Sequence, residues 1–86
     1  MALYKIEWKS SAIRELRGLE KSIIRKILAE VEKLANNPHP IGSKKLRGSK
    51  YSYRLKMGNY RVVYKVSSSV LTIEIIRVGH RREVYN

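Results

Sequence analysis

The chain is 86 residues long and carries 19 Lys and Arg against 7 Glu, a formal net charge of +12. It contains no Cys, which excludes disulfides, a thiolate nucleophile and Cys-bound zinc. No apolar run approaches the roughly 20 residues of a membrane span, and strand-like alternation rather than a signal peptide starts the chain. We therefore expect residues 1–86 to form a single cytoplasmic domain whose partner is nucleic acid or an acidic protein rather than a membrane.

The N-terminal half predicts one strand and two helices. Residues 3–8 alternate between apolar and polar side chains, as a half-buried strand does. A short helix is expected over about residues 12–17. A second helix begins near residue 20 or 21 and carries one apolar stripe at steps of three and four, until the Asn- and Pro-rich residues 36–40 end it.

The C-terminal half predicts three strands. Residues 51–57 and 60–66 alternate, and Gly58-Asn59 between them fits a two-residue hairpin turn. A second turn at Ser68-Ser69 leads into a last strand over residues 71–78, in a register that keeps the apolar face continuous. The order β-α-α-β-β-β predicts an α+β fold, in which a helical hairpin covers one face of a mainly antiparallel four-stranded sheet.

The positive charge is concentrated in this second half. Residues 44–86 carry 11 Lys and Arg and two Glu, a net of +9, whereas residues 1–43 have a net of +3. The basic and non-periodic segment 41–50 is expected to be a linker without a strand or helix. Excess cationic charge held on a rigid sheet favours binding of a polyanion.

The sheet face that points away from the predicted helices holds the cations, and we call it the outer face. The hairpin register places Lys56 opposite Arg61, a cross-strand arrangement that costs energy unless an anion lies between them. A solvated surface is the alternative, but such surfaces usually mix both signs of charge, so anion binding is favoured. The same register assigns to this face Arg54, Lys65, Thr72, Glu74, Ile76 and Val78.

A short tail follows Gly79 at the end of the last strand, and it can fold back beside the outer face. His80 could transfer protons near neutral pH, although a single histidine is more often structural. Tyr85 could stack on a base, or it could belong to a frayed chain end.

Four segments together carry a family resemblance: Lys45-Leu46-Arg47-Gly48, residues 53–56, residues 58–64 and residues 78–85. They resemble the RelE/ParE superfamily of bacterial and archaeal toxins over essentially the whole chain. The resemblance implies a toxin of a type II toxin–antitoxin module. RelE-type members cut mRNA in the ribosomal A site, and ParE-type members share the fold but act on DNA gyrase.

The resemblance also assigns functions to individual residues. The positions that match RelE-type functional residues are Lys56, Arg61, Arg81 and Tyr85, which favours a ribonuclease. His80 resembles a histidine that related ribosome-dependent toxins use as general acid. Because two residues fewer separate Arg81 from Tyr85 than in RelE toxins, Arg81 and Arg82 compete for one role.

RNA cleavage without a metal requires attack by the 2′-OH, neutralisation of the phosphorane-like transition state and protonation of the leaving 5′-oxygen. The chain has no Asp, so we expect neither a metal site nor another cofactor. Lys56 is the candidate base, Arg61 and Arg81 bind the phosphate, and His80 or Arg81 protonates the leaving group. The candidate RNA-binding residues are Lys44, Lys45, Arg47, Lys50, Arg54 and Arg82.

The expected partners are the ribosome with its mRNA and a cognate acidic, RelB-like antitoxin. The antitoxin would cover the basic face or the helical hairpin, and operator DNA would be contacted only through the antitoxin complex. Two alternatives remain open from the sequence. One is a ParE-like DNA gyrase inhibitor, and the other is a catalytically inactive binding module with the same fold.

Overall fold

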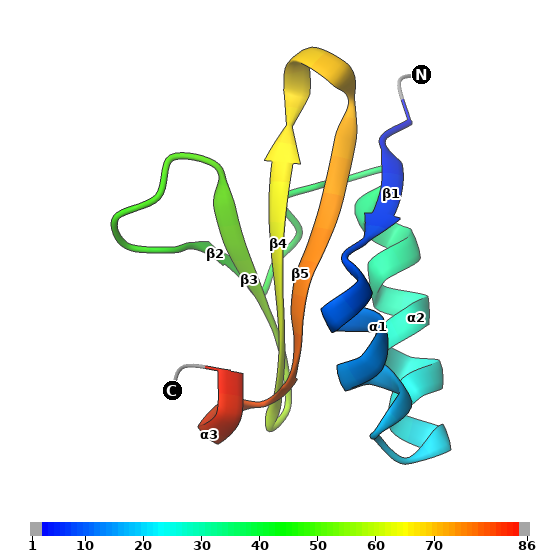
Figure 1. The fold of residues 1–86 in the computed structure, drawn as a ribbon. Helices are drawn as coiled ribbons and strands as arrows, with labels where there is room; N and C mark the ends of the chain where they lie inside the picture. Colours follow the sequence, from blue (N-terminus) through cyan, green and yellow to red (C-terminus); the bar gives the residue numbers. More distant parts are fainter. Residues whose placement is uncertain (1–2, 85–86) are drawn as a thin grey trace.

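The computed structural model describes residues 3–84 and contains a five-stranded sheet with helices on both sides (Figure 1). In chain order the elements are β1 (Lys5–Trp8), α1 (Ser10–Arg17), α2 (Lys21–Leu34), β2 (Ser43–Lys45), β3 (Ser52–Met57), β4 (Tyr60–Ser67), the 3-10 turn η1 (Ser68–Val70), β5 (Thr72–His80) and α3 (Arg81–Val84). The strand order is β1-β5-β4-β3-β2. β1 runs parallel to β5, and every other pair is antiparallel.

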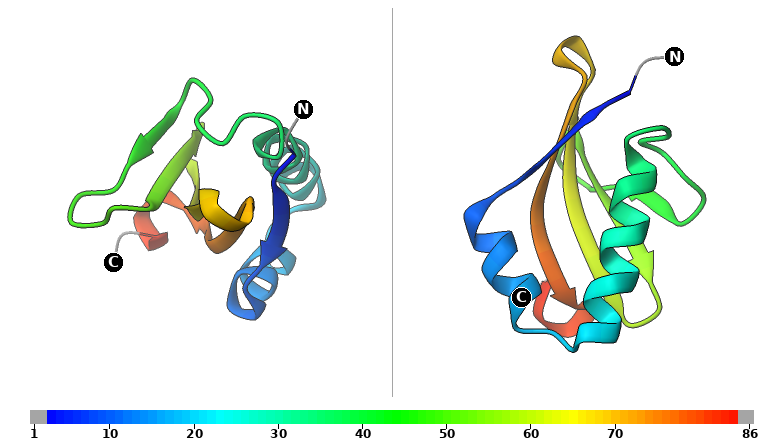
Figure 2. Two further views of the ribbon diagram at one scale, coloured as in Figure 1. Left: turned by 90° about the horizontal axis from the view of Figure 1, so that it is seen from above. Right: turned by 90° about the vertical axis from the view of Figure 1, so that its right-hand side faces the viewer.

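The predicted α+β fold and its two N-terminal helices are confirmed, but the prediction of four strands is wrong. α1 and α2 lie on one face of the sheet, and α3 lies at the C-terminal end of β5 on the other side (Figure 2). The additional strand β2 comes from the segment that we expected to be a linker. Its three residues are too few to show a period, and they become a strand because they pair with the edge of β3.

The helices begin and end close to the predicted positions. α1 starts two residues earlier than expected, because the Lys9 carbonyl already accepts hydrogen bonds from the amides of Ala12 and Ile13. α2 buries Ile27, Val31 and Leu34 against the sheet, which accounts for its apolar stripe. Within residues 3–84, no helix is long and apolar enough to cross a membrane.

The inner face of the sheet packs against α1 and α2 and forms the core. Tyr64 of β4 lies at its centre with no exposed surface, and its hydroxyl donates a hydrogen bond of 2.7 Å to the Pro38 carbonyl. Burial raises the pKa of the Tyr64 phenol above its ordinary value of 10.0, and the nearby Tyr53 adds to this, whereas a hydrogen bond with Ser43 lowers it. The buried side chains from the sheet that surround it are Leu55, Val62, Val66, Ile73, Ile75 and Val78.

The buried phenol makes stability depend on alkaline pH. Because folding raises the Tyr64 pKa, its contribution is complete below the unfolded pKa of about 10 and is lost as the pH rises toward the folded pKa. We expect the free energy of unfolding to fall more steeply above pH 10 in the wild type than in Tyr64→Phe. Below pH 10 the variant should be about 1 kcal/mol less stable, because the Pro38 carbonyl loses its donor. Urea denaturation between pH 8 and 11 measures both effects, and parallel pH profiles would contradict this assignment.

The β3–β4 hairpin has the predicted register. Met57 pairs with Tyr60 across Gly58-Asn59, and Lys56 pairs with Arg61. Gly58 has a φ of 60°, a left-handed conformation that glycine adopts without the steric cost a side chain would bring. This turn therefore determines which side chains of the two strands meet.

The predicted β4–β5 turn is wrong. Val66 pairs with Ile73 rather than with Leu71, and the chain turns through η1 with Leu71 at a φ of 46°. A tight two-residue turn requires positive φ inside the loop, and the two serines that we expected there give no preference for it. The shift is two residues, so it leaves the Val66, Ile73 and Ile75 side chains on the inner face, as predicted.

A bulge in the β4–β5 pairing changes the outer face as well. Tyr64 pairs with Ile75, but Val63 pairs with Arg77, so Ile76 is an extra residue in β5. Beyond the bulge the alternation is inverted. Val78 turns into the core beside Val62, whereas we expected it on the outer face, and Arg77 takes the outer position.

Candidate active site

Two rows of paired residues cross the outer face of the sheet. In the first row, Lys56 of β3 pairs with Arg61 of β4, and Arg61 pairs with Gly79 of β5. The second row runs from Lys44 through Arg54 and Val63 to Arg77. Side chains of paired residues share a face, so the basic residues of both rows lie on one side, as the hairpin register predicted for Arg54, Lys56 and Arg61.

Arg61 is held at the β3–β4 turn and is only 7% exposed. Its Nη1 donates hydrogen bonds to the carbonyls of Gly58 at 2.7 Å and Tyr60 at 2.8 Å. Its buried Nε has no hydrogen-bond partner in the described part of the chain. The turn therefore fixes one edge of the guanidinium and leaves the group short of acceptors.

Among the described residues 3–84, no carboxylate forms an ion pair with Arg61. The ion pairs found among residues 3–84 involve Lys5, Lys33 and Arg77 as the cations. A buried charge without a partner is costly, because the protein does not replace the solvation that water gives it. A bound anion would remove much of this cost.

The tail forms α3 and folds back against this end of the sheet. The Arg81 amide donates a hydrogen bond of 2.8 Å to the Asn59 carbonyl in the β3–β4 turn. Val84 is buried, and a Cβ placed on Gly79 would lie 3.4 Å from its Cγ2. Residues three apart share a side of a helix, so Arg81 lies on the same side of α3 as Val84, whereas Arg82 points away from the sheet.

His80 lies on the other side of the strand from Arg61. It pairs with Tyr60, whose ring centroid is 5.8 Å from that of His80, and Tyr60 lines a groove next to α2. The His80 Nδ1 accepts a hydrogen bond of 3.2 Å from the Arg82 amide, so the neutral ring carries its proton on Nε2. The structure thus brings Lys56, Arg61 and the start of α3 together and directs His80 toward the opposite face.

The remaining candidate residues are distributed along the same half of the molecule. Lys44 and Arg54 are a cross-strand pair on the outer face, but Lys45 pairs with Tyr53 and points to the inner side. Arg47 and Lys50 are exposed in the connection between β2 and β3. The candidate base-stacking residue Tyr85 lies outside the described residues. Among residues 3–84, no three His, Cys, Asp or Glu side chains lie close enough together to hold a metal ion.

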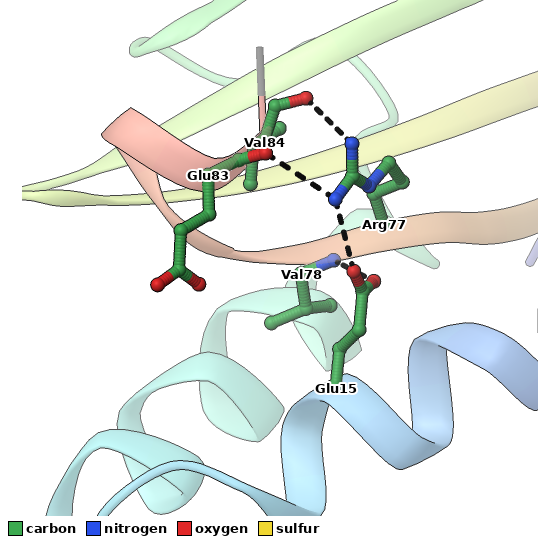
Figure 3. A network of polar contacts seen from close by, with 5 residues as sticks. All are labelled: Glu15, Arg77, Val78, Glu83 and Val84. Carbon is green, nitrogen blue, oxygen red and sulfur yellow. Dashed lines mark hydrogen bonds and ion pairs between the residues drawn. The ribbon is translucent and has the colours of Figure 1, made fainter. Parts of the chain in front are cut away.

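Sequence reasoning missed a polar network that joins α1, β5 and α3 (Figure 3). The guanidinium of Arg77 donates to the carbonyls of Val84 at 2.9 Å and Glu83 at 3.3 Å, and to the Glu15 carboxylate at 3.1 Å. The second oxygen of Glu15 accepts a hydrogen bond of 3.1 Å from the Val78 amide. Only the bulge places Arg77 on this face, and the alternation along the strand contains no signal for a bulge.

Comparison with known proteins matches this chain to one family. The model of the family described as ParE toxin of the type II toxin–antitoxin system parDE matches residues 6–85. The chain belongs to the ParE toxin family, within the RelE/ParE superfamily. The predicted resemblance is confirmed.

The relatives of this ParE-family chain carry RelE names. It is 36% identical to a RelE-like toxin protein of Escherichia coli in an alignment that covers 96% of the chain and 90% of that protein. It is 29% identical to the mRNA interferase toxin RelE of Escherichia coli strain K12, again over 96% of the chain and 90% of the relative. RelE in the archaeal RelE–RelB complex from Pyrococcus horikoshii superposes with a TM-score of 0.82 at 27% identity, over 96% of the chain and 99% of that protein.

Proposed function

We propose that this toxin is a ribosome-dependent endoribonuclease that cuts mRNA in the ribosomal A site and so stops translation in the cytoplasm. The observation that carries the proposal is Arg61, which is 7% exposed, lies between Lys56 and Gly79, and has no carboxylate partner within residues 3–84. A structural arginine would be expected to have a counter-charge. The mRNA interferase named among the relatives supports the same activity.

The chemistry that fits this site starts from the substrate itself. The RNA 2′-OH loses its proton and attacks the adjacent phosphorus, while the bond from phosphorus to the 5′-oxygen breaks. The products are a 2′,3′-cyclic phosphate and a 5′-hydroxyl, which takes up a proton. A protein accelerates this step chiefly by stabilising the negative charge that develops on the phosphate oxygens.

The residues divide these tasks by position. Arg61, with one edge of its guanidinium held by the turn carbonyls, is preorganised to receive a phosphate with minimal reorganisation. Lys56, its cross-strand neighbour, is the base for the 2′-OH. Arg81, on the side of α3 that faces the sheet, supplies the second positive charge.

His80 and the outlying basic residues have secondary roles. His80 pairs with Tyr60, the neighbour of Arg61, so its side chain leaves the strand on the face opposite Arg61. It serves as the leaving-group acid only if the substrate bends around the end of the strand. Tyr85 stacks on or orients a base. The residues that hold the RNA backbone are Lys44, Lys45, Arg47, Lys50, Arg54 and Arg82. No metal or other cofactor takes part.

The second candidate is inhibition of DNA gyrase, which the ParE description of the matching family favours. Two assays on the purified chain separate the candidates. The ribonuclease cuts a translated mRNA within the A-site codon, as mapped by primer extension, and leaves gyrase supercoiling unchanged. Loss of supercoiling without mRNA cleavage would establish the gyrase inhibitor instead.

The partner that we propose is an acidic antitoxin of the RelB type, because RelE of Pyrococcus horikoshii is seen in complex with RelB. A groove of about 600 Å³ lies between α2 and the β3–β4 hairpin. Its mostly apolar lining suits one face of an amphipathic helix, and the formal net charge of +12 of the chain suits an acidic partner. The residues that line the groove are Ile23, Lys26, Ile27, Ala29, Glu30, Ile41, Leu55, Lys56, Met57, Gly58 and Tyr60. Operator DNA would be contacted through this antitoxin.

A further inference from the structure

α3 is too short to be stable by itself. It comprises four residues, Arg81–Val84, which is about one helical turn, whereas isolated helices shorter than about 12 residues are marginal in water. Yet it carries Arg81, which the proposed function requires at a defined place beside Arg61. Contacts outside the helix must therefore determine its position.

Two of these contacts fix the first residue of α3 and the face of α3 that packs on the sheet. The Arg81 amide is bound to the Asn59 carbonyl at 2.8 Å, and Val84 is buried against Gly79. Neither contact satisfies the carbonyls at the C-terminal end of the helix, which have no partner within it.

Arg77 supplies the third contact. Its Nη1 and Nη2 reach the carbonyls of Val84 and Glu83, so a single side chain caps the end of α3 (Figure 3). A cation at this position also interacts favourably with the negative end of the helix. A planar guanidinium can donate to several acceptors in a fixed geometry, which a lysine cannot do.

Glu15 of α1 holds Arg77 in this orientation. One carboxylate oxygen accepts from Arg77 at 3.1 Å, and the other accepts from the Val78 amide at 3.1 Å. Pairing between β1 and β5 ends at Trp8 and Ile75. Beyond this point the Glu15 carboxylate, rather than β1, accepts the hydrogen bond of the Val78 amide. The two side chains are 29% and 37% exposed, which leaves the pair partly shielded from water.

We propose that Arg77, oriented by Glu15, is a positioning residue that clamps α3 and holds Arg81 beside Arg61. The inference deepens the proposed function and rests on it for the cleavage readout. The alternative is a surface ion pair without functional effect, which typically contributes about 0–1 kcal/mol. The clamp differs from such a pair because Arg77 also donates two hydrogen bonds to backbone carbonyls of α3.

The test compares three variants of the full chain. Arg77→Ala removes the clamp. Glu15→Gln keeps an acceptor for the Val78 amide and removes the charge that orients Arg77. Lys33→Ala removes an exposed ion pair with Glu30 on α2, outside the site, and is the matched control. Each variant is measured by hydrogen exchange of the Arg81 amide, which is bound to the Asn59 carbonyl, by urea denaturation, and by cleavage kinetics on programmed ribosomes.

We expect Arg77→Ala to lose exchange protection in α3 and to lower kcat about 10- to 100-fold with little change in KM, since small misplacements of a reacting group cost about this much. Glu15→Gln should show the same changes to a smaller extent, and adding it to Arg77→Ala should change little. Lys33→Ala should match the wild type in all three measurements.

Two results would overturn the clamp: retained α3 protection in Arg77→Ala, or lost protection with wild-type kcat. A fall in kcat matched by an equal fall in the folded fraction would also count against it, because that pattern reports general stability. If the wild type cleaves no mRNA, the proposed function fails, whereas the exchange data still show whether Arg77 orders α3.

Discussion

Replacing Arg61 with alanine is expected to reduce ribosome-dependent mRNA cleavage by at least about 100-fold, the usual effect of removing one preorganised donor to a developing oxyanion. The variant should also be less stable by about 1–3 kcal/mol, because the carbonyls of Gly58 and Tyr60 lose their donor. Domains of this size have about 5–15 kcal/mol of stability, so the variant remains folded at 25 °C. Single-turnover cleavage and urea denaturation measure the two effects separately.

Arg61→Lys is the matched comparison for this prediction. It keeps the positive charge, but one ammonium cannot hold the turn carbonyls and a phosphate in the planar geometry of a guanidinium. We expect its cleavage rate to lie between those of the wild type and Arg61→Ala. Wild-type cleavage by folded Arg61→Ala would contradict the assignment of Arg61 to the site.

Replacing Arg81 with alanine should reduce cleavage about as strongly as Arg61→Ala, but without loss of stability. Arg81 is exposed, and substitutions of exposed residues usually change stability by less than about 0.5 kcal/mol. Its backbone bond to Asn59 does not depend on the side chain, so α3 keeps its place. The same kinetic and denaturation measurements apply.

Arg82→Ala is the control, because the resemblance to RelE toxins leaves Arg81 and Arg82 as alternatives for the same functional position. Arg82 points to the side of α3 away from the sheet, and we expect its loss to weaken cleavage less than about 10-fold through reduced RNA affinity. A larger effect of Arg82→Ala than of Arg81→Ala would reverse the assignment of the two residues.

Local signals in the sequence were sufficient for the β3–β4 hairpin and for the residues on it. Gly58-Asn59 selects a tight turn, and the turn sets the register that pairs Lys56 with Arg61. The apolar stripe of α2 likewise predicted which face of the sheet is covered. Each of these features depends on residues that are close together in the chain.

Features that depend on tertiary contacts could not be predicted in the same way. The strand β2 forms because the edge of β3 is available. The bulge inverts β5, so Arg77 and Val78 exchange sides relative to the alternating pattern. Glu15 and Arg77 are 62 positions apart in the chain, and no local pattern connects them. The sequence therefore predicts the basic row but not the network that positions α3.

The identity of the cleavage products tests the proposed attack by the 2′-OH most directly. The wild-type chain is incubated with mRNA, once on ribosomes and once free, and the ends of the fragments are analysed. We predict cleavage only on ribosomes, within the A-site codon, with a 2′,3′-cyclic phosphate on the upstream fragment and a 5′-hydroxyl on the downstream one. A 5′-phosphate, which requires attack by water, or intact mRNA under both conditions would contradict it.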